Sequence, residues 1–142
     1  MGNTTSTKKV NFEDIQYLIK KKRNFLLINT LDPNQQDCLI KKTVPIHDEE
    51  KLINKCLSEN KEVNIIVYDK NANAPNLMKK YEQLVSLGFY NVYIYPGGLF
   101  EWLCLQDIYG YEDFPTTKKE LDILKFKGQS VFTSYMLTNN ID

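Results

Sequence analysis

The chain has 142 residues, enough for one domain with a substantial core and too few for a second globular unit. Its 18 basic and 18 acidic residues balance, so no overall field attracts nucleic acid, and no apolar run is long enough to predict a membrane-spanning helix. The 3 cysteines lack Cys-x-x-Cys or Cys/His spacing, which excludes a disulfide framework or a metal motif and favours a reducing, cytoplasmic location.

The N-terminal segment, residues 1–7, is polar, and we expect it to be flexible, with a short edge strand at residues 8–10. Its start, MGNTTS, fits the consensus M-G-x-x-x-[ST], in which Gly2 accepts a myristoyl chain once Met1 is removed. One acyl chain binds a bilayer only marginally, so attachment would also use the basic residues at 8–9 and 20–23. The motif predicts weak, peripheral membrane association, either of a eukaryotic protein or of a protein from a virus that infects eukaryotic cells.

The first half of the chain predicts two helices and two strands. Apolar residues at helical spacing behind an Asn11 N-cap predict a helix over residues 11–22. The run NFLLINT predicts a buried strand at 24–30, and the turn sequence LDPNQQD follows it. A brief strand is expected at 43–46, and Asp48 is the expected N-cap of the next helix.

The second half contains the strongest signals. VNIIVYD, residues 63–69, is apolar on both faces, as a central parallel strand requires. A helix follows with Pro75 in its first turn and Gly88 as its C-terminal cap, then a strand at 91–95 and a helix after PGG. This alternation predicts an α/β fold with a mostly parallel sheet covered by helices on both faces. Thr117 and Glu120 have capping-box spacing and predict a short helix toward residue 126.

Several segments of the chain occur in the same order and at the same spacing as the matching segments of a known family. They are VNFEDI, FLLIN, LIKKTVPI, IIVYD, LVSLGF and NVYIYPGGLFEWL. Together they resemble a single rhodanese-like domain over residues 8–102, and the most specific part is the strand followed by Gly97, Gly98 and a helix with Trp102. The resemblance implies the three-layer rhodanese-like fold. We place the domain at 8–128, with a tail at 129–142.

The resemblance also indicates a site at the end of the central strand. The family's sulfurtransferases carry a cysteine there, which becomes a persulfide and heads a loop that typically contains glycine and arginine. Asp69 stands at that position here, and the loop holds neither cysteine nor arginine. The family's early aspartate and arginine are replaced by Asn29 and Leu31. The resemblance therefore implies a degenerate active-site loop, made up of Asp69, Lys70, Asn71, Ala72, Asn73 and Ala74.

Asp69 has a simpler interpretation as well, because aspartate is a common cap of loops and helix starts. An enzymatic alternative is sulfur transfer by a displaced thiol. Cys38 is the candidate, since it alone lies in a loop-like segment, whereas Cys56 and Cys104 are expected to pack in the core.

The leading hypothesis is a catalytically inactive binding or scaffold module for a protein partner, without cofactor, metal or nucleic acid. The surface offered would be the degenerate loop or the aromatic region from Trp102 to Phe114, although these rings are also expected to pack in the core. A further alternative is a structural component of a larger complex, which the tail after Gly128 would contact.

Overall fold

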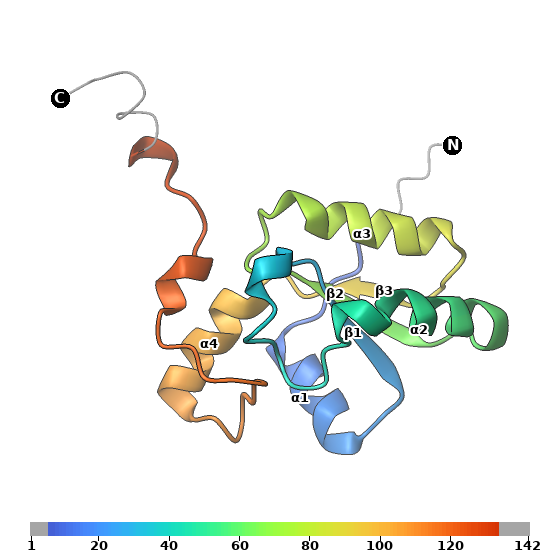
Figure 1. The fold of residues 1–142 in the computed structure, drawn as a ribbon, viewed down its shortest axis with the longest axis horizontal. Coiled ribbons are helices and arrows are strands. Elements are labelled where there is room, and N and C mark those ends of the chain that lie inside the picture. The colour runs from blue at the N-terminus through green and yellow to red at the C-terminus, as the bar shows by residue number, and fades with distance from the viewer. Residues whose placement is uncertain (1–5, 134–142) are drawn as a thin grey trace.

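The computed structural model describes residues 6–133 and has a parallel sheet between two layers of helices (Figure 1). The strands are β1 (Phe25–Asn29), β2 (Asn64–Tyr68) and β3 (Val92–Ile94), in the order β1-β2-β3. The central strand β2 pairs with β1 along its whole length and with β3 over three residues. Because both faces are covered by helices, β2 is apolar on both. The expected α/β fold is confirmed.

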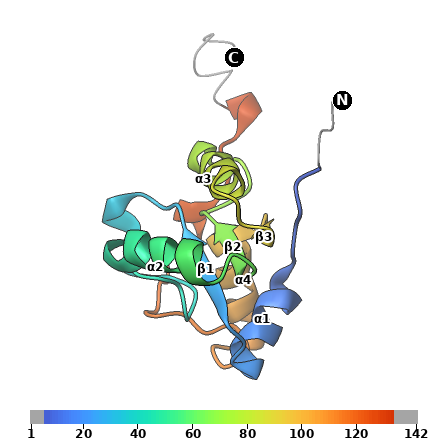
Figure 2. The same cartoon turned by 90° about the vertical axis from the view of Figure 1, so that its right-hand side faces the viewer.

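Two helices cover each face of the sheet, so α3 and α1 lie on opposite sides of the strands (Figure 2). Helices α2 (Ile46–Glu59) and α3 (Pro75–Ser86) share one core with Ile65 and Val67. Helices α1 (Phe12–Lys21) and α4 (Gly98–Tyr109) share the other with Ile66 and Tyr68. The alternation of side chains along β2 separates the two cores.

Local signals set most helix ends as expected. The side chain of Asn11 accepts hydrogen bonds from two backbone amides of the first turn of α1. Pro75 opens α3, and Gly88 follows its end with a φ of 106°, a conformation that glycine adopts without strain. Helix α4 begins at Gly98, directly after the PG of the predicted turn.

Two predicted strands are wrong. Residues 8–10 and 43–46 each contribute a single parallel bridge, Lys9 with Ile94 and Thr43 with Leu27. The second segment has no room for more, because α2 begins at Ile46, before the predicted Asp48 cap. The backbone of Asp48 instead donates to the carbonyl of the actual N-cap, Pro45 (2.9 Å).

The predicted helix from Thr117 to residue 126 is also wrong. The Thr117 hydroxyl donates to the carbonyl of Asp37 (3.0 Å) rather than capping a helix. In this segment only the short 3₁₀ helix η2 (Ile123–Phe126) forms. The other 3₁₀ helix of the described residues, η1 (Pro33–Gln35), lies in the loop after β1.

Within residues 6–133, no helix combines the length and apolar character that crossing a bilayer requires. The predicted lipid acceptor Gly2 lies outside the described residues, as does the predicted tail beyond residue 133.

Candidate functional site

Asp69 directly follows the central strand, and its side chain is buried at 4% exposure. Its Oδ2 accepts a hydrogen bond from the Thr30 hydroxyl (2.5 Å), and its Oδ1 accepts one from the backbone amide of Lys70 (2.6 Å). Burial raises the pKa of this carboxyl above its usual value, and the two hydrogen bonds oppose that shift. The carboxylate therefore joins the ends of β1 and β2 and heads the loop, as in the capping interpretation.

The rest of the loop is a short turn that leads into α3. The Asn71 side chain accepts from the backbone amide of Asn73 (2.9 Å), which closes an Asx turn, and it donates to the carbonyl of Phe126 (3.0 Å). Ala72 is exposed, and Ala74 is the N-cap of α3 without a side-chain hydrogen bond. The loop thus presents lysine and amide groups and contains no thiol.

The double glycine holds this loop against α4. The backbone amides of Leu99 and Phe100, in the first turn of α4, donate to the carbonyls of Asp69 (2.9 Å) and Lys70 (3.0 Å). Gly98 has a φ of 65°, and a Cβ there would lie 2.5 Å from the carbonyl oxygen of Asp69. Only glycine permits this approach, so this part of the family motif positions the loop.

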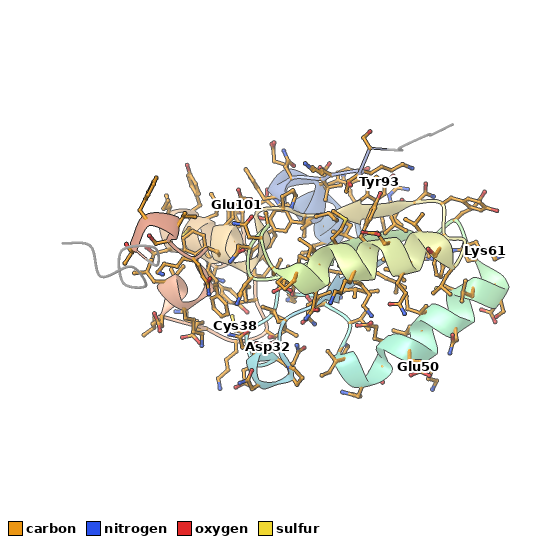
Figure 3. All side chains as sticks on the ribbon, turned by 90° about the horizontal axis from the view of Figure 1, so that it is seen from above. Asp32, Cys38, Glu50, Lys61, Tyr93 and Glu101 are labelled. Carbon is orange, nitrogen blue, oxygen red and sulfur yellow. The ribbon has the colours of Figure 1, made fainter. Side chains whose placement is uncertain are left out.

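At Gly97 a Cβ would instead meet the carboxylate of Glu101, which accepts a hydrogen bond from the Tyr95 hydroxyl (2.6 Å). Figure 3 labels Glu101 on α4.

The chain that follows η2 lies beside the loop. Lys127 and Gln129 line a hollow of about 220 Å³ together with loop residues, from Lys70 to Pro75. The C-terminal segment therefore narrows access to the loop, which no pattern in the sequence indicated.

The three cysteines differ in their burial. Cys38 lies in the segment after β1 that also contains Asp32 (Figure 3), but it is buried at 5% exposure and belongs to the core under α1 and α4. Burial raises the pKa of its thiol. Cys56 and Cys104, expected in the core, are both partly exposed, and Cys56 packs against the core shared by α2 and α3. The residue expected to be the most reactive is thus the most buried of the three.

The aromatic region divides into buried and exposed parts. Trp102 is fully buried, packs edge-on against Phe114 (5.1 Å between ring centroids) and donates to the carbonyl of Pro115 (3.1 Å). Tyr109 and Tyr111 remain 65% and 42% exposed. Core packing, the interpretation favoured by the sequence, holds for Trp102 and Phe114 and not for the two tyrosines.

Sequence reasoning missed Thr30 as the partner of Asp69, and it missed the role of Asn29. The buried Asn29 amide accepts from the backbone of Leu31 (3.1 Å) and from the Gln36 side chain (2.8 Å), which fixes the loop after β1. A usable signal existed, because Thr30 follows β1 as Asp69 follows β2, and adjacent parallel strands end at the same edge.

Comparison with known proteins places the fold in one family. Residues 14–104 match the model of the rhodanese-like domain. No match to a curated protein was found.

Similar solved structures include the rhodanese-like domain of an Anabaena protein, with 21% identity, a TM-score of 0.55, and 89% of this chain and 88% of that chain covered. A yeast protein tyrosine phosphatase of the rhodanese family has 13% identity, a TM-score of 0.60 and coverages of 85% and 99%. A thiosulfate sulfurtransferase from Pseudomonas aeruginosa has 15% identity and a TM-score of 0.56, with 69% of this chain and 19% of that one covered. At these identities the likeness shows the fold alone. Because the family model matches more than half of the chain, the chain belongs to the rhodanese-like domain family.

Proposed function

We propose that this rhodanese-like domain does not transfer sulfur and acts as a protein-binding module. The observation that carries the proposal is Asp69 itself. The residue at the end of the central strand is a buried carboxylate bound to Thr30 and to the Lys70 amide, where the family's sulfurtransferases carry a thiol.

The chemistry of sulfur transfer requires a thiolate, which attacks the donor and holds the sulfur as a persulfide. A carboxylate does not form that intermediate, and its negative charge disfavours an anionic donor near the loop amides. No cysteine occurs between Cys56 and Cys104, so a shift of a few residues in the alignment supplies no thiol. Phosphatase chemistry that uses a loop cysteine meets the same obstacle.

The enzymatic alternative at Cys38 is disfavoured by its surroundings. Its thiol is buried, and its pKa is raised, so the reactive thiolate is scarce at neutral pH. A donor would also have to open the core to reach it.

The test is thiosulfate-dependent sulfur transfer to cyanide by the full chain, with persulfide mapping of all three cysteines by mass spectrometry. We expect neither turnover nor a persulfide. Turnover with a persulfide on Cys38, abolished in Cys38→Ser, would show that the protein is an enzyme. Cys104→Ser serves as the matched thiol control.

We further infer that the module is tethered weakly to membranes through a lipid on Gly2. The consensus at the start of the chain supports this inference, together with exposed lysines at positions 8, 9 and 20–22. In eukaryotic cells, Gly2→Ala should move the protein from the membrane fraction to the soluble fraction. An unchanged distribution would contradict the inference and leave the catalytic proposal untouched.

A further inference from the structure

Exposed apolar side chains gather where α4 ends. The chain that leads into η2 lies beside α4 (Figure 1). Residues of α4 and of the segment 119–123 line a hollow of about 300 Å³. Leu103, at 1% exposure, and the partly buried Ile123 line it from below. Leu121, at 91% exposure, and Tyr111, at 42%, line it at the surface. We call these four residues and the hollow between them the α4-end surface.

A leucine exposed to this extent gains nothing from burial when the free protein folds. Apolar groups that remain in water forgo about 25 cal/mol per Å² of stabilisation, and apolar patches with a polar rim commonly mark interaction sites. Ile108 and Leu124, at 69% and 64% exposure, extend the apolar character along α4 and η2. The α4-end surface therefore has the composition of an interface.

The charge around this surface is negative on balance. Between residues 107 and 122 there are five acidic side chains against two lysines, a formal net charge of −3 in a chain whose total is zero. Glu120 is paired with Lys125 (2.5 Å). Asp107, Glu112, Asp113 and Asp122 are exposed, against the exposed Lys118 and Lys119, and Lys119 lines the hollow itself. The carbonyl end of α4 adds the negative pole of its helix dipole. Such a field repels anionic lipid and nucleic acid and attracts a cationic partner.

We propose that the α4-end surface binds a basic amphipathic helix of a partner protein. The apolar stripe of such a helix would fill the hollow between α4 and residues 119–123, in the way that helices commonly enter apolar grooves. Its lysines or arginines would lie over the acidic rim. The proposal rests on the proposed function, since it names the partner chemistry and the surface of that binding module.

The probe is a labelled peptide of ~15 residues, a length that supports a helix, built from leucine and lysine with leucines at i, i+3, i+4 and i+7. A second peptide keeps the leucines and replaces every lysine with glutamate. Fluorescence anisotropy with the full chain should show binding of the lysine peptide, weakened by salt, and none of the glutamate peptide. Absence of binding by the lysine peptide would overturn the proposal.

Variants locate the binding on the protein. Leu121→Ser should weaken binding about tenfold or more, because it removes most of an interfacial leucine. The matched control is Leu87→Ser, a leucine at 42% exposure just after α3. Glu112→Lys combined with Asp113→Lys should also weaken binding, because it removes negative charge that attracts the lysine peptide. All four side chains are exposed, so the variants are expected to fold.

Equal affinities of Leu121→Ser and the unmodified chain would overturn the proposal, as would amide chemical-shift changes confined to the face formed by α2 and α3. The result is independent of the sulfur-transfer assay. Turnover of thiosulfate would refute the catalytic proposal alone, whereas loss of peptide selectivity would refute this surface alone.

Discussion

At the scale of single residues, Asp69 is a buried acid directly after the central strand. Its carboxylate is satisfied by Thr30 and by the Lys70 amide, yet burial still raises its pKa because the charged form loses hydration. An acid with a raised folded-state pKa binds its proton more tightly in the folded chain than in the unfolded one. Its ionisation therefore opposes folding.

Asp69→Asn tests this consequence, because asparagine keeps the shape and stays neutral. As pH rises from the ordinary aspartate pKa of 3.8 through the higher pKa of Asp69, the unmodified chain should lose stability relative to the variant. The measurement is the free energy of unfolding in urea across a pH series. Asp113→Asn makes the same substitution at an exposed position and is the control for the change of side chain itself. A difference between Asp69→Asn and the unmodified chain that stays constant across the pH series would contradict the prediction.

At the scale of elements, the start of α4 and the candidate loop form one unit. The first amides of α4 use the carbonyls of Asp69 and Lys70 as acceptors, and Gly98 makes room for them. The close approach of the loop backbone thus explains the glycine at position 98.

Two glycine variants separate backbone strain from steric contact. Gly98 and Gly110 both have positive φ, but a Cβ on Gly98 would overlap the loop carbonyls, whereas one on Gly110 meets nothing within 4 Å. Gly110→Ala should cost about 1 kcal/mol, and Gly98→Ala about 3 kcal/mol or more, since the loop must also move. Chemical denaturation of both variants gives the comparison. Equal losses would mean that the loop is not held against α4.

The elements that the sequence predicted correctly carry their own signals. Asn11, Pro75 and Gly88 each fix a helix end within one turn of their own positions. The strand β2 can be identified from its sequence because it is apolar on both faces. The segments at 43–46 and 117–126 were predicted wrongly because distant partners decide them. Thr117 matches a helix cap locally, but its hydroxyl bonds to Asp37, 80 residues away in the sequence.

The candidate site follows the same division. The position of Asp69 at the end of β2 was predictable from the strand itself. Its bond to Thr30 spans 39 residues, and the bond from Asn71 to Phe126 spans 55. Such contacts depend on how the strands and the C-terminal segment come together, which periodicity does not encode.

At the scale of the whole molecule, the folded unit is longer than its family match. The match ends at residue 104, yet Phe114 and Phe126 are 3% and 2% exposed and share a core with Trp102. The domain boundary predicted at residue 128 stays a prediction, and the energetic role of η2 bears directly on it.

Two neighbouring positions of η2 test whether this segment belongs to the fold. Phe126→Ala should cost about 3–5 kcal/mol of stability, because it empties a buried aromatic site beneath α4. Leu124→Ala, in the same 3₁₀ helix at 64% exposure, should change stability by no more than about 0.5 kcal/mol. Urea unfolding of both variants makes the comparison. Small and equal effects would mean that the cooperatively folding unit ends with α4. A large difference between the two variants would mean that this unit includes η2, the segment that leads to the residues narrowing access to the loop after β2.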